Sequence, residues 1–212
     1  MKITLCSSEV VPFAKTGGLA DVCGALPLAL ERQGHEVSIF LPKYKSISTE
    51  QYHLKYLNHA VASTKIGKNI SVYFVEHENY FFRDGLYGNM NGDYPDNLER
   101  FQFFCLKTLE IIHQLNIKSD VIHCHDWQTS LIPVYLKFRF GEDSFFQKIR
   151  SVLTIHNLAY QGVFQKEKFP SLGLDPALFQ MEGLEFYNQI NLLKGGILYS
   201  DAVTTVSPTY AA

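Results

Sequence analysis

The chain has 212 residues, of which 46% are hydrophobic and 19% are charged, and its formal net charge is -2. This composition is typical of a folded protein, because disordered chains combine low hydrophobicity with high net charge. The near-neutral balance excludes a general attraction to nucleic acid or anionic membranes, and no apolar run is long enough for a signal segment or a membrane span. We expect one large cytoplasmic domain over residues 1–212, with no nucleic-acid or membrane partner.

The cysteines occupy isolated positions, and no C-x-x-C pair is present. A chain of this length forms a core without covalent crosslinks, so it does not depend on disulfides. We expect reduced, mostly buried thiols at Cys6, Cys23, Cys105 and Cys124.

The N-terminal segment predicts a βαβ unit. Residues 2–6 form an apolar run typical of a buried strand, and residues 19–30 carry apolar side chains at helical spacing behind a glycine-rich loop. Gly34 ends that helix, and residues 36–41 predict a second strand that stops at Pro42. A helical crossover of this kind implies that the two strands are parallel.

The middle of the chain is less regular. Residues 60–66 and 70–76 predict two strands joined by a hairpin turn at residues 67–69. Residues 79–97 are rich in aromatic residues, Gly and Asn, and are too long for a simple connector. Because such loops are often functional, we expect this stretch to border the active cleft.

Strands and helices alternate through the second half. The patterns predict helices over residues 98–115, 127–138 and 187–199, and strands over residues 120–124, 151–155 and 202–205. Alternation of this kind indicates an α/β fold with a doubly wound, mostly parallel, Rossmann-like sheet.

Ligands of such sheets bind beyond the carboxyl ends of the strands. After the first strand come Lys15, Gly17, Gly18 and Asp21, where glycine amides, a helix N-terminus and a lysine together suit a diphosphate. The alternative is a tight turn beside a solvated lysine. The spacing is neither that of a P-loop nor that of a dinucleotide-binding loop, which argues against ATPase and NAD-dependent activities.

Asp126 and Trp127 follow a later strand, at the predicted rim of the cleft. A carboxylate beside an indole is common where sugar hydroxyls and ring faces are recognised. The alternative for Asp126 is a helix cap, because the predicted helix begins at Trp127.

His156 and Asn157 close the next strand, where an imidazole can bond a substrate. The alternative is a structural histidine satisfied by nearby backbone. His123 and His125 share one face of their strand, but Cys124 points the other way and no third ligand has a recognisable spacing, so we expect no metal.

The segments Lys15–Val22, His125–Gln128 and Thr154–Gly162 together resemble the bacterial glycogen synthase and plant starch synthase family. The resemblance begins at Met1 and continues through residues 83–88 to residues 206–210, so it covers essentially the whole chain. It implies the N-terminal, acceptor-side half of a two-domain GT-B glycosyltransferase. The implied reaction moves glucose from ADP-glucose to the non-reducing end of an α-1,4-glucan, retains the anomeric configuration and needs no metal or other cofactor.

The resemblance also implies roles for individual residues. Lys15 is expected to contact the donor phosphates, to which Gly17 and Gly18 offer backbone donors. Asp126 and His156 are expected to act in catalysis. Asp21 and Asn157 are expected to line the glucose pocket with them.

The family's second domain, which carries most nucleotide contacts, is absent from this sequence. Because the chain stops just after Tyr210, we expect a truncated chain that is inactive by itself. One alternative is another GT-B transferase that uses UDP-glucose or forms sucrose. The other is a non-catalytic glucan-binding module that holds oligosaccharide through Trp127 and nearby aromatic residues.

Overall fold

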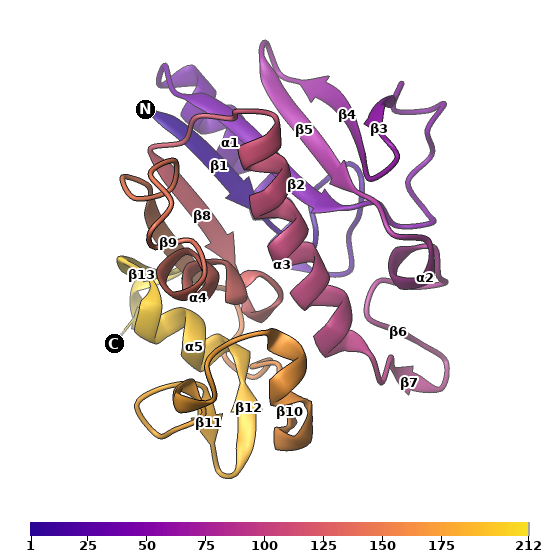
Figure 1. The fold of residues 1–212 in the computed structure, drawn as a ribbon. Helices are drawn as coiled ribbons and strands as arrows, with labels where there is room; N and C mark the ends of the chain where they lie inside the picture. The colour runs from indigo at the N-terminus through magenta and orange to yellow at the C-terminus, as the bar shows by residue number, and fades with distance from the viewer. Residues whose placement is uncertain (212) are drawn as a thin grey trace.

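An eight-stranded sheet forms the centre of the computed structural model, which describes residues 1–211 (Figure 1). Six neighbouring strands are parallel, and the last two are added through antiparallel pairs, so that only β4 runs in the opposite direction. The mostly parallel sheet and the hairpin in the middle of the chain are therefore confirmed. In spatial order the strands are β13 (Ala202–Thr205), β9 (Arg150–Ile155), β8 (Val121–His125), β1 (Lys2–Cys6), β2 (Glu36–Pro42), β5 (Ile70–Val75), β4 (Val61–Ile66) and β3 (Lys55–Asn58).

Helices cover both faces of this sheet. The crossover from β1 to β2 contains α1 (Gly18–Arg32), and the crossover from β5 to β8 contains α3 (Asn97–Gln114). These crossovers run in opposite directions across the sheet, so right-handed connections place the two helices on opposite faces. Figure 1 shows α3 crossing in front of β1 and β2. The sheet is thus doubly wound, with its switch point between β1 and β8.

The remaining helices are short. They are α2 (Glu78–Phe81), α4 (Leu131–Phe138), α5 (Leu192–Tyr199) and α6 (Pro208–Ala211), with 3-10 turns η1 (Trp127–Thr129), η2 (Lys166–Leu172) and η3 (Pro176–Leu178). Among the described residues, no helix is both long enough and apolar enough to cross a membrane.

The helix expected over residues 127–138 is divided in two. Its first part is η1, and α4 starts only at Leu131. The hydroxyls of Thr129 and Ser130 donate to the Asp126 carbonyl at 3.3 and 3.0 Å. Hydroxyl bonds of this kind compete with the regular helical ladder.

The helix expected over residues 187–199 starts late, at Leu192. Residues 189–191 instead form β12 (Gln189–Asn191), the middle strand of a small antiparallel sheet with β10 (Val163–Gln165) and β11 (Glu185–Phe186). Tyr187 and Asn188 make the tight turn into β12 with φ of 48° and 60°. The Asn191 side chain then caps α5 by accepting from the Lys194 N–H at 2.9 Å. A further pair of two-residue strands, β6 (Gly88–Asn89) and β7 (Gly92–Asp93), lies in the aromatic stretch.

The core consists of apolar side chains between the sheet and its helices. α3 shows the amphipathic pattern that the sequence predicts, with Phe101, Cys105, Leu109 and Ile112 buried along one face. The four cysteines are free and buried, as expected.

Candidate functional site

The carboxyl ends of β1, β8 and β9 meet at the switch point of the sheet. In the parallel register, Cys6 lies beside Cys124 and His125 lies beside Thr154, so the three strands end at one level. The residues that follow these ends are Glu9, Asp126 and His156. Because ligands of open α/β sheets bind at such a point, this edge is the candidate site.

Asp126 has an unusual backbone conformation, and its side chain is held by a hydrogen bond from the end of the neighbouring strand. Its side chain accepts a hydrogen bond from the His156 N–H at 2.7 Å, which joins the ends of β8 and β9. Its side chain makes no capping bond to η1, so the interpretation as a helix cap is wrong. Its φ of 58° and ψ of -175° are unusual for a residue with a side chain, and such strain, of order 1–3 kcal/mol, is concentrated at functional sites.

Asp126 is buried, with 8% of the residue exposed. Burial raises its pKa to about 6, against the lowering effect of hydrogen bonds from the backbone N–H groups of His156 and Asn157. A carboxyl in such surroundings is costly to ionise, and its charge responds strongly to any positive charge that develops nearby.

Three histidines lie side by side next to Asp126. His125 is fully buried, and its Nδ1 lies 2.9 Å from Nε2 of the half-buried His156. His123 Nε2 lies 2.6 Å from the Thr154 hydroxyl. Burial lowers the pKa of all three, to about 4 for His123, so the imidazoles are neutral near neutral pH.

Lys15 and Asp21 lie together at the start of α1. The Lys15 ammonium contacts both carboxylate oxygens of Asp21, at 2.7 and 2.8 Å, and both side chains are exposed. An exposed pair of this kind contributes little to stability, so Lys15 is free to exchange Asp21 for an anionic ligand at little cost.

Glu9 occupies the amides that the sequence assigns to a phosphate. This buried carboxylate accepts from the Thr16 N–H, from the Thr16 hydroxyl at 2.6 Å and from the Gly17 N–H at 3.2 Å. The expectation that Gly17 presents a free amide therefore does not hold in this structure, because a buried carboxylate needs donors of its own. Space remains beside the loop, since a Cβ on Gly17 or Gly18 would meet no atom within 4 Å.

Tyr87 connects the aromatic stretch to the same strand end. Its hydroxyl lies 2.7 Å from both the Ser8 hydroxyl and the Glu9 carboxylate. Residues 79–97 therefore reach the segment that follows β1, next to the candidate site that the sequence expects this stretch to border. Neither Glu9 nor Tyr87 is predicted as a site residue, because a single carboxylate after a strand and one tyrosine among many aromatic residues carry no spacing signal.

Trp127 does not lie at the rim of the site. Its indole is 8% exposed and packs against Phe101 and Phe164, with ring centroids 5.1 and 5.7 Å apart. The backbone of Gly162 covers it so closely that a Cβ there would lie 2.5 Å from the ring. The expectation of an exposed indole for sugar stacking is therefore wrong. Asn157 is exposed next to His156, and its side chain accepts from the Ala159 N–H at 3.0 Å.

Two of the histidines belong to a cluster that sequence spacing does not reveal. One ligand atom each from Cys23, His125 and His156 lie within 4.8 Å of one another. Cys23 comes from α1, so the third member is brought in by the fold and not by a local motif.

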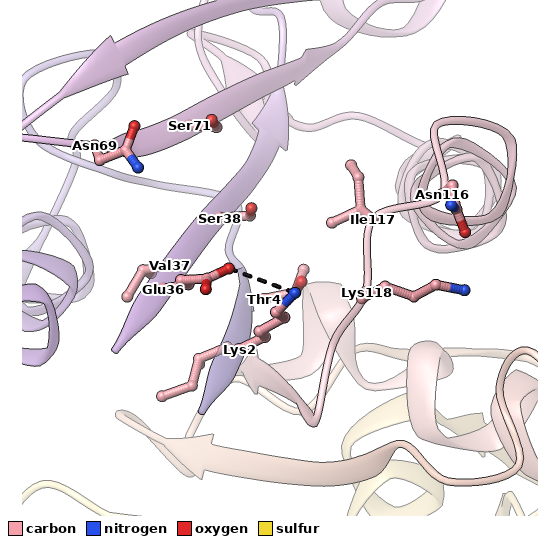
Figure 2. A pocket seen from close by; sticks show the side chains of 11 residues that line it. Lys2, Thr4, Glu36, Val37, Ser38, Asn69, Ser71, Asn116, Ile117 and Lys118 are labelled. Carbon is pink, nitrogen blue, oxygen red and sulfur yellow. Dashed lines mark ion pairs between the residues drawn. The ribbon is translucent and has the colours of Figure 1, made fainter. Parts of the chain in front are cut away.

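A cavity of about 240 Å³ lies at the opposite, amino end of the sheet (Figure 2). Lys2, Thr4, Glu36 and Ser38 line it, with an ion pair of 3.6 Å between Lys2 and Glu36. Its lining includes none of the predicted site residues, so it is separate from the candidate site.

The doubly wound sheet with polar groups at its switch point defines the class: this is a Rossmann-like α/β domain of the kind that forms the N-terminal half of a GT-B glycosyltransferase. The chain matches the family described as starch synthase catalytic domain over residues 2–212, and it belongs to that family.

Curated relatives include the glycogen synthases of Geotalea daltonii and Syntrophotalea carbinolica, at 49% and 48% identity. The matches cover 99% and 100% of this chain but 46% of each relative, so the chain spans about half their length.

Solved structures of glycosyltransferases share this fold. The catalytic domain of starch synthase IV from Arabidopsis thaliana, bound to ADP and acarbose, superposes with a TM-score of 0.87 at 32% identity, over 99% of this chain and 45% of that one. A sucrose-phosphate synthase structure from Thermosynechococcus elongatus shares the fold, with a TM-score of 0.52 at 14% identity, over 100% of this chain and 80% of that one.

Proposed function

We propose that this chain is the acceptor-side half of a glucosyltransferase that moves glucose from ADP-glucose to the non-reducing end of an α-1,4-glucan, with retention of configuration. The proposal is supported by the family and by the curated relatives, which are glycogen synthases. The related plant structure binds ADP and acarbose, ligands that resemble a spent donor and an oligosaccharide.

The observation that carries the proposal is the junction of Asp126 and His156 at the switch point. Transfer builds positive charge on the glucose ring as the bond to the diphosphate breaks. A buried carboxylate stabilises such charge more strongly than one in water, because the surrounding dielectric is low. We assign Asp126 to this role and His156 to orientation of the sugar hydroxyls, with Asn157 beside them.

Lys15 balances charge at the leaving diphosphate. In the proposed complex its ammonium leaves Asp21 and contacts the phosphates, next to the open space at Gly17 and Gly18. Asp21, released from the ion pair, then faces the glucose pocket. Glu9 holds the loop through Thr16 and Gly17, so it keeps Lys15 within reach without contacting the donor.

Neither a metal nor another cofactor has a role in this proposed reaction, because a lysine and a helix N-terminus supply positive charge near the phosphates. The four free thiols suit a reducing compartment, and we place the protein in the cytoplasm.

A transfer assay on the intact protein tests the proposal. We expect incorporation of labelled glucose from ADP-glucose into a maltooligosaccharide, with UDP-glucose competing poorly. Equal or better use of UDP-glucose, or formation of sucrose, would favour the alternative transferases of the same fold. Oligosaccharide binding that survives Lys15→Ala without any transfer would favour a glucan-binding module, although the buried indole of Trp127 removes the anchor first expected for it.

A further inference from the structure

The cluster of Cys23, His125 and His156 has the composition of a transition-metal site. Three elements supply it: α1 carries Cys23, β8 ends at His125, and His156 follows β9. One ligand atom from each lies within 4.8 Å of the other two. A thiolate with two imidazoles is a donor set that suits Zn²⁺ and related cations.

The surroundings of the cluster are negative. The Asp126 carboxyl accepts from the N–H of His156, one of the three candidate ligands, at 2.7 Å, and Glu9 follows the neighbouring strand β1. The field that disfavours a thiolate here favours a cation, and a cation makes the thiolate stable.

His125 has unused coordinating capacity. Within the described residues its buried Nε2 has no hydrogen-bond partner, while its Nδ1 faces His156. An unpaired buried nitrogen is costly, so the ring gains from any partner that accepts its lone pair. A neutral imidazole is the protonation state that binds metal.

We propose that Cys23, His125 and His156 bind one zinc-class cation, and that the bound cation blocks glucosyl transfer. On binding, the Cys23 thiol releases a proton to solvent, water leaves the cation, and bonds form to sulfur and to one nitrogen of each imidazole. Three protein ligands leave a fourth position open to water.

The inhibition of glucosyl transfer by the cation follows from the position of His156. A metal-bound imidazole is held in place and cannot turn toward the sugar, and a cation next to Asp126 neutralises the carboxylate that faces the developing positive charge. The inhibition of transfer rests on the proposed function, whereas the binding of the cation does not. The cation is therefore an inhibitor and not a cofactor.

Cobalt(II) titration of the intact, metal-free protein tests the binding part, because a thiolate ligand gives Co²⁺ a charge-transfer absorption band. We expect one Co²⁺ per chain with this band, displaced by Zn²⁺, absent in Cys23→Ser and retained in Cys105→Ser. The Cys105 thiol is buried on α3 and donates to the Gln128 carbonyl at 3.3 Å, so it is a matched control outside the cluster.

A band that survives Cys23→Ser, or no band in the wild type, would overturn the site. Should Cys23→Ser fail to fold, His156→Ala on the half-buried strand end provides the second variant. It should weaken Co²⁺ binding by at least about tenfold, since even a residue that only supports a ligand is worth that much. Unchanged affinity in that variant would also overturn the site.

The transfer assay tests whether the bound cation inhibits glucosyl transfer. Zn²⁺ should inhibit the wild type reversibly, with activity restored by a chelator, and should leave Cys23→Ser unaffected where that variant folds. Stoichiometric metal at the cluster with undiminished transfer would leave the site standing and contradict the placement of His156 in the glucose pocket. Absence of transfer in the metal-free protein would instead contradict the proposed function, so the two failures are distinguishable.

Discussion

Asp126 shows how a single residue carries several constraints. It adopts a backbone conformation that is strained for a side-chain-bearing residue, buries a carboxyl and receives the N–H of the next strand end. The strained backbone and the buried carboxyl each cost free energy in the folded protein, and the hydrogen bond offsets only part of that cost. Their coincidence at the switch point is the strongest local sign of function in the chain.

We predict that Asp126→Asn lowers turnover of the intact protein by about 10²-fold or more, because the amide lacks the charge that stabilises the transition state. The amide oxygen can still accept from His156, so the melting temperature should change little. Transfer rates and thermal melting of the two proteins check this. Normal turnover in a folded Asp126→Asn protein would remove Asp126 from the reaction.

Substitution of Lys15 tests its proposed role at the diphosphate. Lys15→Ala should slow transfer by about 10²-fold or more, because the positive charge matters most as the diphosphate leaves. Lys15→Arg should restore part of the rate, since the guanidinium keeps the charge but has another shape. Wild-type rates in Lys15→Ala would mean that Lys15 is only the solvated partner of Asp21.

At the scale of elements, Asp201 joins the edge strand β13 to β9. Its carboxylate accepts from the N–H and hydroxyl of Ser151 at 2.8 and 3.0 Å, and from the Arg150 guanidinium at 2.9 Å. Partial burial raises the pKa of Asp201, but these bonds outweigh it and lower the pKa below its ordinary value.

A lowered folded-state pKa gives a defined dependence of stability on pH. The contribution of Asp201 is fully present above its ordinary pKa and is lost as pH falls through the lowered pKa. Asp201→Asn should therefore reduce stability at neutral pH and make the protein less sensitive to acid than the wild type. Urea unfolding as a function of pH measures both effects, and parallel curves for the two proteins would contradict this role.

The large elements are predictable from the sequence because each has a strong local signal. Residues 3–6 are buried and mostly apolar, and α3 repeats buried side chains at helical spacing. The small sheet of β10, β11 and β12 has strands of two or three residues, too short for any periodicity to appear. Its presence delays α5, so the late start of that helix could not be predicted either.

The residues of the candidate site also fall into two groups, those that the sequence predicts and those that it does not. Asp126 and His156 are predictable because they follow strands, and the parallel sheet brings strand ends together. Glu9 and Cys23 are not, because their roles depend on how the glycine loop and α1 pack against the sheet. The sequence predicts Trp127 at the rim of the site, which is wrong, because the sequence does not show that Gly162 and the small sheet cover the indole.

At the scale of the molecule, the end of the site that we propose for the donor phosphates carries its charge on side chains and a helix N-terminus. Treatment of the intact protein with a chelator should therefore leave the transfer rate unchanged in buffer free of added metal. Rates before and after dialysis against the chelator check this prediction. A loss of activity that a divalent cation restores would show that the reaction needs a metal.

The candidate site lies where the carboxyl ends of β1, β8 and β9 meet. Transfer requires a donor held in place and water excluded from the reacting carbon, and closure of two domains over the sugar achieves both. In the proposed function this chain provides one wall, and its relatives are about twice as long. On this proposal, the other wall and most contacts to the nucleotide come from a region that corresponds to the other half of those relatives.

Glucosyl transfer by the isolated 212-residue chain, measured beside the intact protein under the same conditions, tests this account most directly. We predict that the isolated chain folds, as circular dichroism and cooperative melting would show, and transfers no glucose from ADP-glucose, while the intact protein extends a maltooligosaccharide. Robust turnover by the isolated chain, or none by the intact protein, would contradict the claim that this edge of the sheet is half of a glucosyltransferase active site.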